Sequence, residues 1–155
     1  MLSTPAEFVP ADPGYADRVR SSFGRQAVMA TLGIHLDAVE PGRVSLRMRH
    51  RDDLTQQHGF LHAGVVSTAL DSACGYAAFS LMPAEAAVLT IEFKVNLLAP
   101  ARGPEFRFEA QVTKAGRTIS VVDGRALEHG PSGERVVATM TATIMTVMGR
   151  EGVRH

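Results

Sequence analysis

Residues 65–79 read VVSTALDSACGYAAF, and this stretch decides the fold class. It is apolar on nearly every side, with small residues around much of its circumference. A helix of that composition is buried on most of its faces. The length and the alanine content argue against a strand, and Pro83 limits the helix on its C-terminal side. The stretch therefore predicts a helix at the centre of the domain.

Six strand candidates flank this helix. Two precede it, alternate between apolar and polar residues, and are separated by the turn signal Pro41-Gly42. Four follow it with hairpin-like spacing, which predicts antiparallel neighbours. The candidates are residues 34–39, 44–49, 87–98, 104–113, 118–127 and 135–147. One buried helix beside a long antiparallel sheet predicts an α+β fold in which the sheet wraps around the helix.

Another helix is expected before the sheet. Apolar residues recur at helical spacing over residues 15–32, and Gly33 suits the end of such a helix. Gly24 lies inside the segment and weakens its helical pattern. Residues 1–14 contain three prolines and predict an irregular lead-in. An extra N-terminal helix at this place is free to cover a sheet edge or a groove between subunits.

The composition limits the classes of function. A length of 155 residues fits one domain, residues 1–155. Lys plus Arg and Asp plus Glu each number 16, so no net charge draws the chain to nucleic acid or to a membrane. No apolar run reaches the ~20 residues of a membrane span, and the N-terminus lacks a secretory pattern. Cys74 is the single cysteine, which excludes an internal disulfide and favours a cytoplasmic location.

One charged side chain, Asp71, lies within the central helix segment. A carboxylate among apolar residues is costly unless it is paired or hydrogen-bonded; taken alone, it would indicate a solvent groove or a backbone contact. The helix start near His62 adds a second signal, because free N–H groups at a helix N-terminus can polarise a carbonyl and stabilise an oxyanion. Gly64 permits close approach of a ligand, and Gln56 could add a side-chain donor.

Helix geometry separates these two signals. Asp71 follows His62 by nine residues, which corresponds to about 900° of rotation and about 13 Å of rise. The two side chains would lie on opposite faces and far apart along the axis, so one helix cannot bring both to the same small carbonyl group. If they serve one site, Asp71 comes from a second copy of the chain. A two-fold dimer with neighbouring helices would form two equal sites.

The run QQHGFLHAGVVSTALDSACG, residues 56–75, resembles the hotdog-fold acyl-CoA thioesterases of the phenylacetic-acid-degradation (PaaI-like) type. Their pattern is an Asn or Gln, a Gly, then His-Gly-Gly, and an acidic residue nine positions after the His. The matching residues are Gln56, Gly59, His62, Gly64 and Asp71. Ala63 departs from the usual Gly; its N–H is retained, but its methyl group lines the pocket. The resemblance covers residues from about 33 to 147 in element order.

The resemblance implies a homodimer, usually paired into a homotetramer, with the acyl-CoA substrate bound between subunits. It also implies that Asp71 acts as nucleophile or general base, a choice that one sequence leaves open. The Ala63 N–H would polarise the thioester carbonyl, and Gln56 and His62 would shape that side of the site. Thr90, ten residues before a strand-end proline, would hold the attacking water or orient Asp71; it equally suits a strand as a β-favouring residue.

Coenzyme A carries phosphates, so basic residues are expected at the mouth of such a site. Lys114 and Arg117 flank a turn between two predicted strands, and similar turns in the family meet the nucleotide. A solvated hairpin turn is an equally good interpretation, and Arg102 is a weaker candidate. No phosphate-binding loop is present, and the histidines match no metal-ligand pattern, so neither cofactor nor metal is expected. Cys74 is predicted to be an inert packing thiol.

Three activities fit a hotdog domain. The first is hydrolysis of an aryl- or medium-chain acyl-CoA thioester to the free acid and CoA. The second is binding of acyl-CoA without turnover, and the third is a hydratase or dehydratase, in which the catalytic acid and His are placed differently. Intact Gln56 and Asp71, and the nine-residue spacing from His62 to Asp71, favour the thioesterase. The acyl group and the packing of a tetramer stay open.

Overall fold

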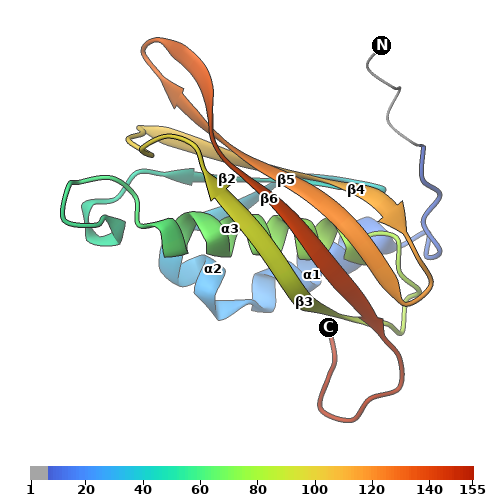
Figure 1. Cartoon of the computed structure of the whole chain (residues 1–155). Coiled ribbons are helices and arrows are strands. Elements are labelled where there is room, and N and C mark those ends of the chain that lie inside the picture. The colour runs from blue at the N-terminus through green and yellow to red at the C-terminus, as the bar shows by residue number, and fades with distance from the viewer. Residues whose placement is uncertain (1–6) are drawn as a thin grey trace.

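In the computed structural model, which describes residues 7–155, a six-stranded antiparallel sheet curves around one long helix (Figure 1). The helices are α1 (Tyr15–Arg25), α2 (Ala27–Leu32), the 3-10 helix η1 (Asp52–Leu54) and α3 (Ala63–Phe79). The strands are β1 (Ile34–Glu40), β2 (Arg43–Arg49), β3 (Ala87–Leu97), β4 (Glu105–Ala115), β5 (Ile119–Gly130) and β6 (Gly133–Val147). The predicted α+β class, with the sheet around a central helix, is confirmed.

The sheet has the order β1-β2-β4-β5-β6-β3, and every neighbouring pair is antiparallel. The chain passes from β2 to β3 through α3, and so moves from one side of the sheet to its far edge. Residues 98–104 then return from that edge to β4 in the middle. This return segment passes the ends of β6 and β5, where it bonds to Val137 and Glu128.

Helix α3 is buried because its small and apolar side chains fill the concave face of the sheet. Leu70, Ala73 and Phe79 are fully buried. Strand β5 lies against the helix at Gly124, where an added Cβ would lie 3.0 Å from Cys74 Sγ and 3.3 Å from Leu70 Cδ2. A glycine in the strand therefore lets helix and sheet approach each other.

The predicted N-terminal helix is divided in two. A single helix over residues 15–32 is wrong, because Gln26 has extended backbone angles (φ −80°, ψ 95°) between α1 and α2. The Gln26 side chain accepts a hydrogen bond from Ser72 of α3 at 3.0 Å. Gly33 ends α2 in the left-handed region (φ 68°), as predicted. The irregular lead-in is confirmed for residues 7–14; its first six residues lie outside the described ones.

The two N-terminal helices cover part of α3 and one edge of the sheet. Arg18 of α1 is buried, donates to the Met82 carbonyl at 2.8 Å, pairs with Asp12 at 3.0 Å, and stacks 4.3 Å from the centre of the Phe79 ring. Both helices also contact the edge strand β1. Of the two positions that the sequence left open, a sheet edge or a groove between subunits, these contacts favour the sheet edge.

The other edge, β3, is open within residues 7–155. Its apolar side chains Leu89, Ile91, Phe93 and Leu97 are 41%, 54%, 44% and 56% exposed. A bulge between Thr90 and Glu92 shifts the pairing with β6. A long apolar edge strand of this kind is a template for pairing with another chain.

Candidate active site

The N-terminal end of α3 presents a backbone N–H that is available to a ligand. His62 is the N-cap residue, and its Nδ1 accepts the Gly64 N–H at 2.8 Å. The His62 carbonyl accepts the N–H groups of Val65 and Val66 at 2.9 and 3.3 Å. No acceptor for the Ala63 N–H occurs within residues 7–155. Of the groups at this positive helix end, the Ala63 donor is the one left free to polarise a carbonyl.

Gln56 begins a tight loop that leads into this helix end. Its side-chain Oε1 accepts the N–H groups of His58 and Phe60, the latter at 3.4 Å, and its own N–H donates to the Phe60 carbonyl at 2.8 Å. Because the amide oxygen is occupied inside the loop, the amide nitrogen is the end of this side chain that can donate to a ligand. Leu54 and His62 are joined by a further backbone bond of 3.0 Å, which ties the loop to the start of α3.

Gln56 and Ala63 line one cleft of about 380 Å³. The rest of its wall is mostly apolar. It comes from the loop, from α3, from the end of β3 with the following return segment, and from β6. The lining residues are Gln56, Phe60, Leu61, Ala63, Val66, Leu97, Leu98, Ala99, Pro100, Ala101, Val137 and Ala138. A mainly apolar cleft with a few polar groups at one end is the usual form of a small-molecule site.

Asp71 lies in a second, separate environment. Its Oδ1 accepts a hydrogen bond from the Thr90 hydroxyl at 2.7 Å. The carboxyl group is half-buried, and this desolvation raises the pKa of Asp71, while the Thr90 hydrogen bond opposes the rise. A carboxylate with a raised pKa and a fixed orientation is suited to accept a proton or to attack a carbon atom.

The structure does not bring these two environments together within one chain. Helix α3 is continuous from Ala63 to Phe79, so Asp71 lies about 12 Å along the helix axis from Ala63. His62 is the N-cap and has extended backbone angles, so the predicted half-turn between its side chain and Asp71 does not follow from the helix. Thr90 lies near the start of β3, whereas Leu97, which lines the cleft, lies at its end. Within residues 7–155, the two environments therefore lie at opposite ends of β3.

The basic turn lies at the Asp71 end of the molecule. Lys114 is near the end of β4, Arg117 lies in the turn that follows, and both side chains are exposed. Across the sheet, Thr90 pairs with Ile144, Ile144 with Ser120, and Ser120 with Ala115. These paired residues lie side by side across four neighbouring strands. The turn after Ala115 is therefore three strand spacings, or about 14 Å, from Thr90. Gly64, by contrast, follows the cleft residue Ala63 at the start of α3 but does not itself line the cleft.

Other reactive groups contribute no alternative site. Cys74 is buried under the sheet, and its desolvation raises the pKa of the thiol to about 12, which keeps it protonated. Among residues 7–155, no three His, Cys, Asp or Glu side chains are grouped to hold a metal ion. No helix in that same range is long and apolar enough to cross a membrane.

Comparison with known proteins identifies the relatives of this chain. Residues 58–132 match the model of the family described as "Thioesterase superfamily". A solved thioesterase family protein of Silicibacter pomeroyi is 62% identical, with a TM-score of 0.86, and the match covers 88% of this chain and 100% of that one. A Saccharolobus solfataricus protein named "Putative esterase" is 33% identical over 105 residues, which are 68% of this chain and 69% of the relative. The chain belongs to the thioesterase superfamily.

A further solved structure shares the fold of this chain. The Escherichia coli PaaI protein from the phenylacetic acid degradation operon matches with a TM-score of 0.79 over 90% of this chain and 97% of its own, at 18% identity. At that identity the likeness is one of fold. The predicted hotdog fold, the resemblance to PaaI-like proteins and the assignment to the thioesterase class of enzymes are confirmed. The roles of individual site residues stay predictions.

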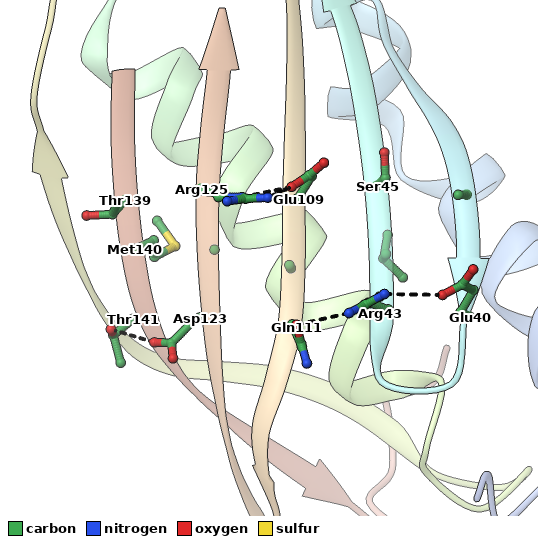
Figure 2. Close-up of a pocket in the computed structure, with 14 residues that line it drawn as sticks. Glu40, Arg43, Ser45, Glu109, Gln111, Asp123, Arg125, Thr139, Met140 and Thr141 are labelled. Carbon is green, nitrogen blue, oxygen red and sulfur yellow. Dashed lines mark hydrogen bonds and ion pairs between the residues drawn. The ribbon is translucent and has the colours of Figure 1, made fainter. Parts of the chain in front are cut away.

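A second hollow of this thioesterase lies elsewhere. It measures about 740 Å³ and opens on the outer face of the sheet, with α3 behind the strands (Figure 2). Its polar side chains are bonded to one another: Arg125 to Glu109 at 2.8 Å, and Thr141 to Asp123 at 2.9 Å. None of the predicted site residues lines it. The alternation of polar residues along the strands predicts such an outer face, but not a hollow in it.

The sequence interpretation missed a buried carboxylate, Glu128 on β5. In the structure it is 8% exposed and accepts backbone N–H groups of the return segment. Val122, Gly124 and Ala126 of β5 are buried, and Glu128 continues this alternation on the same face. The period of two along the strand was therefore a signal that could have placed this Glu on the inner side of the sheet.

Proposed function

We propose that this thioesterase-superfamily protein hydrolyses acyl-CoA thioesters at a site formed by two subunits. The observation that carries the proposal is a pair of incomplete half-sites about 12 Å apart along α3, beside the open strand β3. One half offers the Ala63 N–H and an apolar cleft; the other offers the half-buried Asp71 carboxylate. Hydrolysis of a thioester needs a donor for the developing oxyanion and a base or nucleophile, and each half supplies one of them.

Antiparallel pairing of β3 with β3 of a second copy would unite the halves. The Thr90 that bonds to Asp71 is near the start of the strand, and the Leu97 that lines the cleft is at its end. Two-fold symmetry sets the start of one strand opposite the end of the other. Asp71 of one subunit would then face the cleft of the other, and the exposed apolar side chains of β3 would be buried. A homodimer with two intersubunit sites follows, and its pairing into a homotetramer belongs to the same proposal.

The chemistry follows from these positions. The thioester carbonyl oxygen accepts the Ala63 N–H at the positive end of α3, and the Gln56 amide nitrogen donates from the cleft wall. Asp71 either takes a proton from a water molecule that attacks the carbonyl carbon, or attacks that carbon itself and forms an anhydride that water then cleaves. In both routes the C–S bond breaks, CoA leaves as the thiolate, and the free acid is released. Thr90 orients the Asp71 carboxylate, and His62 fixes the helix start.

The surroundings favour an apolar acyl group. The cleft wall is mainly aliphatic. Gly75 lies one helical turn after Asp71 on the same face of α3; it is buried, yet an added Cβ would meet no neighbouring atom of residues 7–155 within 4 Å. This space beside the carboxylate suits an aryl or medium-chain acyl group. Lys114 and Arg117 are assigned to the CoA phosphates, and a cytoplasmic location, which the single cysteine favours, completes the proposal.

A thiol-release assay on a panel of aryl- and medium-chain acyl-CoAs tests this function, together with an enoyl-CoA hydration assay and equilibrium binding. We expect saturable thiol release and no hydration. Tight acyl-CoA binding without thiol release would instead support a non-catalytic binding protein. Hydration of the enoyl substrate would assign a hydratase.

A further inference from the structure

Glu128 is a buried carboxylate that the proposed reaction does not use. Its Oε2 accepts the backbone N–H of Arg102 at 2.6 Å and that of Gly103 at 3.2 Å. Its Oε1 accepts a hydrogen bond from Arg135 on β6 at 2.9 Å. Three donors thus converge on one carboxylate that is 8% exposed. A buried carboxylate with this many charge-assisted bonds fixes the groups that bind it.

The groups that Glu128 fixes belong to the return segment between β3 and β4. Leu98, Ala99, Pro100 and Ala101 of this segment form one wall of the cleft. Arg135, the partner of Glu128, also donates to the Pro100 carbonyl at 3.1 Å. The Glu128–Arg135 ion pair therefore fixes the cleft wall by hydrogen bonds to its backbone, although neither residue lines the cleft.

The same segment is bonded to the start of α3. The Ala101 carbonyl accepts the Leu61 N–H at 2.9 Å. Leu61 is followed directly by the N-cap His62 and by Ala63, whose N–H is the donor assigned to the thioester carbonyl. A continuous series of bonds thus runs from Glu128 through the return segment to Leu61. Two residues along the chain from Leu61 lies the proposed oxyanion donor.

We propose that Glu128 is a positioning residue, which fixes the return segment and through it the Ala63 N–H and the cleft wall. This inference rests on the proposed function for its catalytic consequence. Catalysis by a preorganised donor depends on its exact placement, because a displacement of an ångström can remove much of the rate. Glu128 sets that placement without touching the substrate.

The protonation state of Glu128 supports this role. Burial raises the pKa of its carboxyl group, but the backbone N–H groups of Arg102 and Gly103, together with the Arg135 guanidinium, outweigh this and lower the pKa below its ordinary value. The group is therefore charged at neutral pH, as its three donors require.

The test compares Glu128→Ala with Glu128→Gln, which keeps one acceptor oxygen, and with Arg135→Met, which keeps much of the stem but loses the guanidinium. Glu109→Gln is the matched control, because Glu109 also pairs with two arginines but on the outer face. We expect Glu128→Ala to lower kcat about tenfold with a smaller change in KM. Glu128→Gln should recover most of that loss, Arg135→Met should fall between them, and Glu109→Gln should match the unmodified protein.

Hydrogen exchange of the Leu61 amide provides a readout that does not depend on activity. In Glu128→Ala and Arg135→Met this amide should exchange about tenfold faster, while the β3–β6 ladder near Thr90 stays unchanged. A kcat within twofold of the unmodified value in both variants would overturn the inference, as would equal acceleration at every amide. If the unmodified protein releases no thiol from any acyl-CoA, the proposed function fails, and the exchange result still decides whether Glu128 holds the helix start. Should Glu128→Ala not fold, Arg135→Met decides alone.

Discussion

The two half-sites of α3 differ in how much of their surroundings a single chain supplies. At the N-terminal end, the loop from Gln56, the return segment and the Glu128–Arg135 pair surround the cleft with bonded backbone. At Asp71, the same chain supplies one hydrogen bond from Thr90 and then an open strand with exposed apolar side chains. In the proposed site, one chain would build the oxyanion side, whereas the carboxylate side would be completed by the chain that pairs with β3.

This difference has a physical reason. A helix N-terminus needs local partners for its N–H groups, and the chain segments next to it in the sequence can provide them. The carboxylate lies about two turns further along the helix, where Asp71 contacts Thr90 of the edge strand β3. An edge strand cannot satisfy its outer backbone groups within the chain. The fold thus leaves unfinished the part of the site that a second copy could complete.

The largest effect is expected for the carboxylate half. Asp71→Asn keeps the shape and the Thr90 contact but removes the charge and the basic site, so kcat should fall roughly 100-fold or more. Folding and acyl-CoA binding should be retained. Steady-state thiol release, with binding followed by calorimetry, measures both. Near-normal turnover in the purified variant would show that Asp71 takes no part in the reaction. The comparison between the two ends of α3 would then say nothing about catalysis.

Subunit complementation tests whether the halves belong to different chains. Gln56→Ala and Asp71→Ala should each be weak alone. Co-refolded in equal amounts, they should regain about a quarter of normal activity, because about half of the dimers are mixed and each mixed dimer has one intact site of two.

The complementation needs two controls. Native mass spectrometry must show mixed dimers, and each single variant must keep a normal melting temperature, since the Gln56 side chain also holds its own loop. Mixed dimers without recovered activity would mean that each chain carries a complete site, and the contrast between the two ends of α3 would have no functional meaning.

The sequence predicted the start of α3 better than the surroundings of Asp71, because the first depends on neighbouring residues and the second on contacts between distant ones. The start of α3 is a local feature, so the helix, its N-cap His62 and the cleft residue Ala63 could be placed from consecutive residues. The contact between Asp71 and Thr90 was expected from the resemblance alone, because the two residues lie 19 positions apart on different elements and no periodic signal links them. The interruption at Gln26 goes with a contact to Ser72, and the donors around Glu128 come from the return segment and β6, so only the packed structure shows them.

An intermediate effect is expected at the basic turn, which lies beyond the carboxylate half. Replacing Lys114 and Arg117 together by Ala should raise KM for acyl-CoA about five- to tenfold with little change in kcat, since phosphate contacts bind ground and transition states alike. Pantetheine thioesters that lack the nucleotide should show almost no effect. Equal losses on both kinds of substrate would assign the turn to structure instead.

The smallest effect concerns the one bond that this chain gives to its carboxylate half. The Thr90 hydroxyl stabilises the charged form of Asp71 and so lowers its pKa, against the rise caused by burial. Thr90→Val removes that bond, so the pKa of Asp71 rises further. A base or nucleophile must be unprotonated, and the acid limb of kcat/KM should therefore move to higher pH, with a fall in the plateau rate of less than about tenfold.

Two control variants accompany Thr90→Val. Thr90→Ser keeps the hydroxyl and should keep the acid limb at the same pH. Thr143→Val removes a comparable bond to Glu92 on the outer face and should leave the pH profile unchanged. An acid limb that stays fixed or moves to lower pH in Thr90→Val would show that Thr90 does not act through the charge of Asp71, and the carboxylate half would then owe its orientation entirely to the partner subunit.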